Sequence, residues 1–329
     1  MALIGCGYWG KNLLRVMMQN PQIELVGVVE PSAEALKVVP EGVSTYSNLK
    51  ELLAKESIDG AAIATPPSTH FELAMSLLQE GIPTLVEKPL ALSSGHVEKL
   101  IDIATQKNAV LMVDHTYCYS PPVEYLGDYI SRGNLGDLLY YDSVRVNLGG
   151  FQPTTNVLWD LAPHDLSILD IWANKKLPHS VVAIGKKHYG SSTENICYVT
   201  LDYEGDFLAH LSINWAAPIK TRKITVTGTQ KMAVYDDNTP TEKIRIYDQR
   251  VDFDNVSPED FKINYRIGSM EAPVILQKEP LTTMMAHFVD CIAKGISPKT
   301  DGASAWRITK ILEAISASME KGGQPTKLD

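Results

Sequence analysis

The stretch Ala2-Leu3-Ile4-Gly5-Cys6-Gly7-Tyr8-Trp9-Gly10 decides the fold of this chain. A short apolar run ends in three glycines with the spacing Gly-x-Gly-x-x-Gly, and apolar residues at helical spacing follow from Leu13 to Met17. A second apolar run, residues 24–29, ends in Glu30, which lies 20 residues after Gly10. This order of strand, tight turn, helix, strand and acid is typical of the first half of a dinucleotide-binding Rossmann domain.

Each glycine of the turn has its own expected role. Gly5 makes the turn, Gly7 lets the backbone approach a pyrophosphate, and Gly10 lets the helix pack against the strand. The N-terminus of that helix offers N–H groups and partial positive charge to the phosphates. We expect Tyr8 and Trp9, which lie between the last two glycines, to contact the cofactor as well.

The acid after the second strand indicates which dinucleotide binds. Glu30 is placed to accept hydrogen bonds from the ribose hydroxyls. Taken alone, it could equally be a solvated acid at a strand end. No Lys or Arg follows it until Lys37, so a 2′-phosphate would find no adjacent cation and NAD is favoured over NADP. The first apolar run is very short, and a few native residues are expected to be missing before it.

Composition bounds the remaining possibilities. The chain has 329 residues, 44% hydrophobic and 21% charged, which is enough for two soluble domains. Its net charge of −9 disfavours a general nucleic-acid or anionic membrane surface. No apolar run is long enough to cross a bilayer, and no signal peptide is evident. Scattered cysteines without C-x-x-C spacing favour reduced thiols in the cytoplasm over a disulfide framework or zinc site: Cys6, Cys118, Cys197 and Cys291.

The two halves of the chain show different patterns. Up to residue 117, apolar runs at 60–64, 83–86 and 110–113 alternate with helical patterns at 71–79 and 96–106. This predicts an α/β Rossmann domain with a doubly wound parallel sheet over residues 1–117.

From residue 118 to 329 the pattern predicts an α+β domain for substrate binding and oligomerisation, with a large, mostly antiparallel sheet. The predicted helices are 123–131, 160–172, 281–293 and 303–319. The predicted strands are 138–148, 181–188, 196–203, 207–214, 222–227, 232–235 and 244–247. Ligands are expected at the carboxyl ends of the strands of the first domain.

Two short motifs follow strands of the first domain. Thr65, Pro66, Pro67 and His70 form a stiff loop along which a nucleotide could pass, although His70 could simply begin the next helix.

The second motif is Glu87-Lys88-Pro89. A lysine at such a strand end can hydrogen-bond a substrate hydroxyl and carry its proton, with Glu87 to orient it. Without its fold context the motif would be a surface ion pair followed by a loop proline.

Asp160 and His164 are four residues apart on a predicted helix, so they share a face and can act together on one proton. A divalent metal is the alternative, but no third ligand is evident and Lys88 would repel it. For these two reasons no metal is expected. A pair of this kind is often a surface feature, but the rest of this helix is apolar, which favours partial burial of the pair.

Candidate substrate-binding residues lie around the domain junction. Tyr117 and Tyr119 could line the nicotinamide pocket or pack the hinge. Arg145 and Asn147 share a face of one strand and could meet a substrate anion, or could be exposed strand residues. Further cations that an anionic substrate could use are Lys220, Arg222 and Lys223.

Taken together, these motifs resemble those of the Gfo/Idh/MocA family of NAD(P)-dependent oxidoreductases, over essentially the whole chain. The resemblance rests on the glycine turn, Ala64-Thr65-Pro66-Pro67-x-x-His70, Val86-Glu87-Lys88-Pro89-Leu90, His115-Thr116-Tyr117-x-Tyr119-x-Pro121 and Trp159-Asp160-Leu161-Ala162-Pro163-His164-Asp165. The tail from Glu279 to Gly302 is also similar. Cys118 stands where many relatives have an arginine.

The resemblance implies an NAD-dependent dehydrogenase acting on a sugar. Lys88 would be the catalytic lysine, and Asp160 with His164 the family's D-x-x-x-H pair, with His164 the usual proton carrier. The form of the last motif is most similar to members that act on sugar nucleotides, such as UDP-N-acetylglucosaminuronate 3-dehydrogenases. The second domain's open sheet would form a homodimer or homotetramer.

Three alternatives remain. One is an inositol or free-sugar dehydrogenase. A second keeps NAD bound and uses transient oxidation to complete an elimination or hydrolysis. The third is an NAD-binding regulator without turnover, which would have no need of Lys88, Asp160 and His164.

Overall fold

The computed structural model describes residues 1–152, 155–253 and 263–328. The chain forms two compact units, and each is discontinuous in sequence. The first contains Met1–Ser120 and Lys278–Lys310, and the second contains Pro121–Gln277 and Ile311–Asp329. The predicted boundary near residue 118 is close to the first crossing. The prediction that residues 118–329 form one domain is wrong, because Lys278–Lys310 belongs to the first unit. This segment is held there by contacts with residues far away in the sequence, which local sequence patterns do not reveal.

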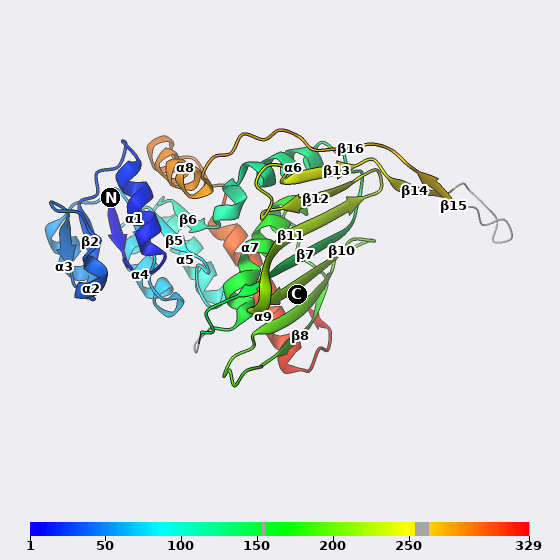
Figure 1. Cartoon of the computed structure of the whole chain (residues 1–329). Coiled ribbons are helices and arrows are strands. Elements are labelled where there is room, and N and C mark those ends of the chain that lie inside the picture. Colours follow the sequence, from blue (N-terminus) through cyan, green and yellow to red (C-terminus); the bar gives the residue numbers. More distant parts are fainter. Residues whose placement is uncertain (153–154, 254–262, 329) are drawn as a thin grey trace. The chain divides into compact units, whose positions relative to one another are not determined.

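The first unit is a Rossmann domain, as predicted. Among its described residues, one parallel sheet has the strand order β3-β2-β1-β4-β5-β6 (Figure 1). The strands are β1 (Ala2–Ile4), β2 (Gly27–Val29), β3 (Ser44–Tyr46), β4 (Ala61–Ile63), β5 (Thr84–Glu87) and β6 (Leu111–Asp114). The order reverses between β1 and β4, and ligands of such sheets bind at the carboxyl ends of the strands beside this point.

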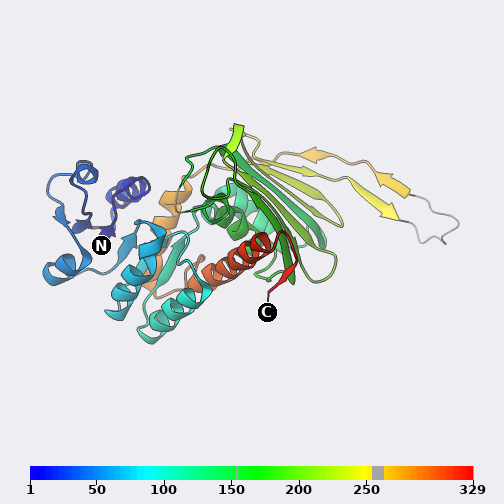
Figure 2. The ribbon, with the colours of Figure 1, turned by 90° about the horizontal axis from the view of Figure 1, so that it is seen from below.

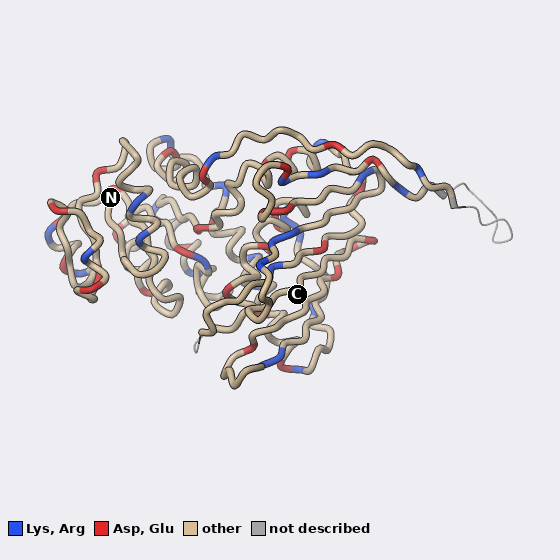
Figure 3. The backbone as a smooth tube through the Cα atoms, in the orientation of Figure 1, with Lys and Arg blue, Asp and Glu red and all other residues tan. Residues whose placement is uncertain are grey.

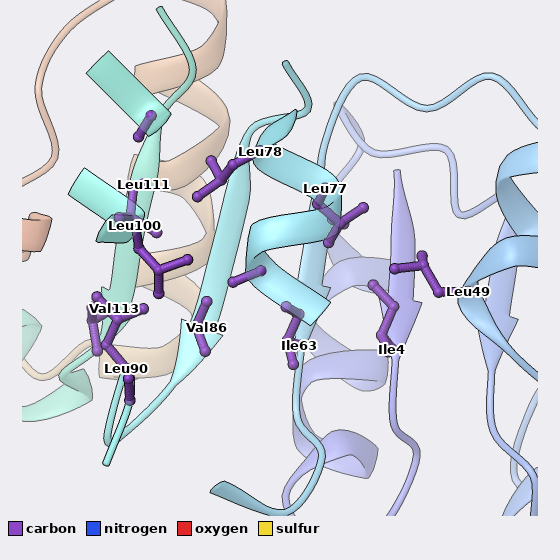
Figure 4. Packing of buried hydrophobic residues seen from close by; sticks show 14 of the residues in the cluster. Ile4, Leu49, Ile63, Leu77, Leu78, Val86, Leu90, Leu100, Leu111 and Val113 are labelled. Carbon is purple, nitrogen blue, oxygen red and sulfur yellow. The ribbon is translucent and has the colours of Figure 1, made fainter. Parts of the chain in front are cut away.

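Helices that lie between these strands in the chain, and others that follow the last strand, bury an apolar core against the sheet. They are α1 (Gly10–Gln19), α2 (Ala33–Leu36), α3 (Leu49–Lys55), α4 (Pro67–Gln79), α5 (Ser94–Gln106), the 3-10 turn η1 (Thr116–Tyr119) and α8 (Pro280–Lys294). In Figure 4, Ile4, Ile63 and Val86 from three neighbouring strands pack with Leu77 of α4 and Leu100 of α5. Strand β3 and helices α2 and α3 fall where the sequence analysis assigned no element.

The returning segment closes the edge of this sheet at β6. Val113 donates its backbone N–H to the carbonyl of Thr300 at 2.9 Å, and the Thr300 hydroxyl donates to the carbonyl of Val113 at 2.6 Å. An isolated bridge pairs Met112 with Asp301. Helix α9 (Gly302–Glu320) begins directly afterwards. The segment therefore covers backbone groups that an edge strand would otherwise expose.

The second unit contains the predicted large, mostly antiparallel sheet. In the part of this unit that is described, its order is β16-β13-β12-β11-β7-β10-β9-β8-β17, and β7 and β10 run parallel. The strands are β7 (Leu138–Leu148), β8 (Ser180–Lys186), β9 (Ile196–Asp202), β10 (Leu208–Asn214), β11 (Ala216–Gly228), β12 (Met232–Asp236), β13 (Ile244–Tyr247), β16 (Met270–Glu271) and β17 (Thr326–Lys327). Strands β14 (Arg250–Phe253) and β15 (Ile263–Arg266) form a separate antiparallel pair.

Helices cover one face of this sheet. Helix α7 (Val157–Trp172) packs on β7, β9 and β10, and α6 (Pro121–Ser131) packs on α7 (Figure 2). The end of α9 lies on the same side, since the indole N–H of Trp159 on α7 donates to the Ser316 hydroxyl of α9 at 3.1 Å. Strand residues alternate accordingly: Leu211 and Ile213 of β10 are buried, while Leu208 is exposed. In the described part of the chain, every helix is too short or too polar to serve as a membrane span.

Candidate active site

The glycine turn after β1 has the geometry of a phosphate-binding turn. Gly5 has φ +92°, and a Cβ there would lie 2.6 Å from the Ala64 carbonyl oxygen. A Cβ on Gly10 would collide with the carbonyl of Gly5, whereas a Cβ on Gly7 would meet nothing within 4 Å. Gly5 and Gly10 are thus required for packing, while Gly7 leaves open space where a pyrophosphate can approach the backbone.

The acid at the end of β2 is held beside this turn. The Glu30 carboxylate accepts the N–H of Cys6 at 2.8 Å and the N–H of Ser32 at 2.9 Å. A cavity of about 740 Å³ opens next to it, lined among others by Gly7, Thr65 and Pro66. Glu30 also lines this cavity, so its carboxylate can meet a ribose there. The residues present therefore suit the adenosine and pyrophosphate portions of NAD.

The aromatic pair in the turn has two different environments. Tyr8 is 92% exposed, so it has free space in which to meet a cofactor. Trp9 is half-buried and its indole N–H donates to Asp114 Oδ2 at 2.8 Å. Pro67 is the first residue of α4, where a missing N–H costs nothing.

His70 has an internal role. Its ring is fully buried, with Nδ1 2.8 Å from the carbonyl of Pro89 and Nε2 2.8 Å from the carbonyl of Thr65. Burial, with the charge of Lys88 as a smaller cause, lowers the pKa of His70. A neutral imidazole has one N–H, so it donates to one carbonyl at a time. His70 thus joins the loops after β4 and β5, and it lies in the first turns of α4, the alternative to a cofactor contact.

Lys88 lies just past the carboxyl end of β5, in a cluster of titratable side chains. It is half-buried, and the Lys88–Pro89 peptide bond is cis. Burial and the neighbouring Asp114 raise the pKa of Glu87 well above its usual range. Burial and then the charge of Lys88 lower the pKa of His115 to about 3. The surroundings therefore favour the neutral form of Glu87, and His115 is neutral at neutral pH, beside Lys88.

His115 is 2% exposed, and neither of its ring nitrogens has a hydrogen-bond partner among the described residues. Such a buried polar group costs free energy.

The second unit supplies the other predicted catalytic pair. Asp160 and His164 are both half-buried on α7, whose first turn is capped by the Asn156 side chain. Asp160 Oδ2 accepts the indole N–H of Trp215 at 3.1 Å, which fixes the carboxylate. Their i, i+4 spacing on a continuous helix confirms that the two side chains share a face. Across the described residues, no group of three or more His, Cys, Asp and Glu is arranged to hold a metal.

The predicted substrate-binding residues separate into two groups. Tyr119 is buried, its hydroxyl lies 3.2 Å from the Thr300 hydroxyl, and Lys299 lies over its ring. Burial raises its pKa. Tyr119 therefore packs η1 against the returning segment. Tyr117 and Asn147 are half-buried, and both remain candidates for substrate contact.

Arg145 is committed to a structural ion pair. It is 3% exposed and donates from Nε to Asp165 Oδ2 at 2.7 Å and from Nη2 to Asp165 Oδ1 at 2.9 Å. A bidentate partner neutralises the guanidinium, so the prediction that it meets a substrate anion is not retained. Of the other cations, Arg222 lies 3.6 Å from Asp237, while Lys220 and Lys223 are exposed.

Sequence reasoning assigned no role to Asp114. It ends β6 and pairs in register with Glu87 at the end of β5. The sequence does contain one indication of its role. Asp114 ends an apolar run, and the preceding predicted strand also ends in an acid, Glu87. The partner of Asp114, Trp9, lies 105 residues away, and no local pattern reports that contact.

These features define an NAD-binding oxidoreductase with two units. Residues 1–115 match the oxidoreductase family with an NAD-binding Rossmann fold, and residues 124–234 match the GFO/IDH/MocA C-terminal domain. Since these matches cover more than half of the chain, it belongs to the GFO/IDH/MocA family. The predicted cofactor, NAD, is thereby confirmed.

Similar proteins include dehydrogenases with different substrates. The chain is 30% identical to UDP-N-acetylglucosamine 3-dehydrogenase of Acidithiobacillus ferrooxidans over 188 residues, 56% of each chain. It is 25% identical to 4-carboxy-2-hydroxymuconate-6-semialdehyde dehydrogenase of Sphingobium sp. over 348 aligned positions, 98% of this chain and 99% of that one. Several other curated relatives are matched over only 41% to 44% of their length.

The fold also matches solved structures. An oxidoreductase from Magnetospirillum magnetotacticum superposes with a TM-score of 0.80 at 26% identity, over 95% of this chain and 98% of that one.

Proposed function

We propose that this protein oxidises a ring hydroxyl of a sugar with NAD, and that its substrate is a nucleotide-linked sugar. The observation that carries the proposal is the position of Lys88, half-buried at the carboxyl end of β5 in the same unit as the phosphate-binding turn. Ligands of parallel sheets bind at such strand ends. The likeness to a UDP-N-acetylglucosamine 3-dehydrogenase supports the substrate class.

The chemistry divides between cofactor and protein. When bound, NAD supplies the acceptor for the hydride that leaves the carbinol carbon. Lys88 and His164 take the proton of the reacting hydroxyl, so that the carbon–oxygen bond becomes a carbonyl. Asp160, held by Trp215, orients His164 from one turn before it on α7. In the reverse direction the same groups return a proton to a ketone.

Charge on the ligand is a further requirement of the proposal. A nucleotide-linked sugar carries a diphosphate, while the chain has a net charge of −9. Acidic and basic residues are interspersed along both units in Figure 3, so cations for this group have to be local. With Arg145 bound to Asp165, exposed Lys220 and Lys223 on β11 are the candidates.

The test is a panel of UDP-sugars, free sugars, inositols and a carboxylated semialdehyde, with NADH formation followed by absorbance. The semialdehyde is included because the Sphingobium relative aligns along nearly the whole chain. Reduction of NAD with a UDP-sugar and no other compound would support the proposal. If NAD were reduced with the semialdehyde and with no other compound, the proposed sugar substrate would be refuted and a semialdehyde would take its place. Product formation without net NADH would indicate transient oxidation.

Lys88→Ala should lower kcat by about 100-fold or more with the active substrate, the usual scale for a lost proton-transfer group. NAD affinity should be nearly unchanged. The matched control is Lys107→Ala at the exposed C-terminal end of α5, which should leave kcat unaltered. The His164→Ala loss should be similar, and the double variant should lose less than the product of the two. A normal kcat in Lys88→Ala would make Lys88 structural.

We also propose that two or four copies associate through the uncovered face of the large sheet. Apolar side chains exposed on its strands support this, among them Ile184, Tyr198 and Leu208. Light scattering should give a dimer or tetramer, and Tyr198→Asp combined with Leu208→Asp should shift it towards monomer. A monomeric wild-type chain at micromolar concentration would refute this association.

A further inference from the structure

Asp114 links the two parts of the first unit that serve the reaction. It is 1% exposed, and its Oδ2 accepts the indole N–H of Trp9 at 2.8 Å. Its Oδ1 accepts the hydroxyl of Thr116. Trp9 is the N-cap residue of α1, and its own carbonyl accepts the N–H groups of Asn12 and Leu13. Asp114 therefore holds the glycine turn at the point where helix α1 begins.

The same carboxylate also holds the strand end that precedes Lys88. Glu87 and Asp114 are paired in register at the ends of β5 and β6, and their side chains are hydrogen-bonded. Two neighbouring carboxylates repel each other when both are charged, and burial together with Asp114 raises the pKa of Glu87. A proton on one of the two carboxyl groups lets them share a hydrogen bond, and the residue that follows Glu87 in the chain is Lys88.

We propose that Trp9, Asp114 and Glu87 form a buried hydrogen-bonded link that couples the phosphate-binding turn to the backbone presenting Lys88. Asp114 is a positioning residue in this link and does not touch substrate. Ordering the turn around NAD fixes Trp9, Trp9 fixes Asp114, and Asp114 fixes the end of β5. The importance of this coupling for turnover rests on the proposed function of Lys88, but the coupling itself is a property of NAD binding.

The first test uses binding alone. Trp9→Phe keeps an aromatic ring and removes the N–H, so the free turn becomes looser and more ordering has to accompany binding. The Kd for NAD, measured by calorimetry, should rise on the order of 5- to 10-fold, which is the scale of the net contribution of one typical hydrogen bond. The matched control is Trp306→Phe, which removes an indole donor to Glu98 at 2.7 Å and should not change the Kd.

The second test measures the coupling directly by hydrogen exchange. NAD should protect the amides of residues 84–90 in the wild-type chain and in Trp306→Phe. This protection should be lost in Trp9→Phe and in Glu87→Ala, whereas protection in the glycine turn remains. Glu87→Gln keeps a neutral donor to Asp114 and should restore the protection at 84–90. If Glu87 had only a structural role, Glu87→Gln and Glu87→Ala would show the same protection of the amides of residues 84–90.

The third test is a double-mutant cycle with Trp9→Phe and Asp114→Asn. Because both act through one link, the double variant should bind NAD about as weakly as the weaker single variant. Thr116→Val takes the place of Asp114→Asn in the cycle if the latter does not fold. The proposal would be overturned if the two single-variant increases in Kd multiplied in the double variant. It would also be overturned if Trp9→Phe left the Kd for NAD unchanged, or if Trp9→Phe kept the protection of residues 84–90. None of these measurements needs a substrate, so they stand apart from failure of the proposed sugar oxidation.

Discussion

At the scale of single residues, we expect Glu30 to determine the preference for NAD over NADP. Its carboxylate is fixed by the N–H groups of Cys6 and Ser32 and lines the cavity beside the turn. A 2′-phosphate would meet this negative charge, so NAD should bind more tightly than NADP. Combining Glu30→Ala with Ser32→Arg should move the ratio of the two Kd values towards NADP. Calorimetric titration with both nucleotides measures the ratio, and an NADP preference in the wild-type chain would refute this role for Glu30.

A second prediction at this scale concerns His115. Its folded-state pKa of about 3 lies below the ordinary value of 6.5, so the unfolded chain binds a proton that the folded chain does not. Its contribution to stability is therefore complete above pH 6.5 and is lost as the pH falls towards 3. Over pH 5.5 to 4 the slope should be about 1.4 kcal/mol per pH unit.

Urea unfolding of the wild type and His115→Leu at several pH values measures this slope. The variant should lose free energy of unfolding less steeply over the same range. It should also be no less stable near pH 5, since it removes a ring whose nitrogens have no partner in the described structure. Identical slopes for both proteins would show that His115 is hydrated and titrates normally.

At the scale of elements, two glycines at the start of α1 should affect different properties, Gly10 the stability of the fold and Gly7 the binding of NAD. Gly10→Ala would push a Cβ into the Gly5 carbonyl and should cost on the order of 1–3 kcal/mol of stability. Gly7→Ala meets nothing within 4 Å, so its stability should stay within about 0.5 kcal/mol of wild type. Its Kd for NAD should rise instead, because the new methyl group occupies the pyrophosphate's space. Unfolding and binding measured on both variants check this, and equal loss of stability would contradict it.

A second prediction at this scale concerns the buried ion pair between Arg145 on β7 and Asp165 on α7. Arg145→Met leaves the Asp165 carboxylate buried without its cation and should cost about 3–5 kcal/mol. Adding Asp165→Leu removes that charge and should recover part of the loss. The control is Arg132→Met, which breaks an exposed pair with Asp128 and should cost less than about 1 kcal/mol. Urea unfolding measures all three, and a small cost for Arg145→Met would show that the pair is solvated.

Element types were predictable where periodicity was strong. The strands at 138–148 and 244–247 have the predicted bounds, because alternating burial on a half-covered sheet leaves a clear pattern. Strand β3 and helix α2 are short and partly exposed, so no pattern marks them. The predicted site residues Gly5, Gly7 and Glu30 meet around one cavity since they come from one local motif. The hydrogen-bond partners of His70 and Arg145 are Pro89 and Asp165, which lie in other elements, so no local pattern indicated that these two side chains have internal roles.

At the scale of the whole molecule, the return of residues 278–310 to the first unit has a consequence for synthesis of the chain. A ribosome makes β6 early, but its hydrogen-bonding partner Thr300 is added almost 200 residues later. Throughout the translation of the second unit, the nascent Rossmann sheet therefore has an unprotected edge, the kind of surface on which chains aggregate. Only when Thr300 has emerged from the ribosome is this edge covered, so the Rossmann domain is completed only after residues 121–277 of the second unit have been made.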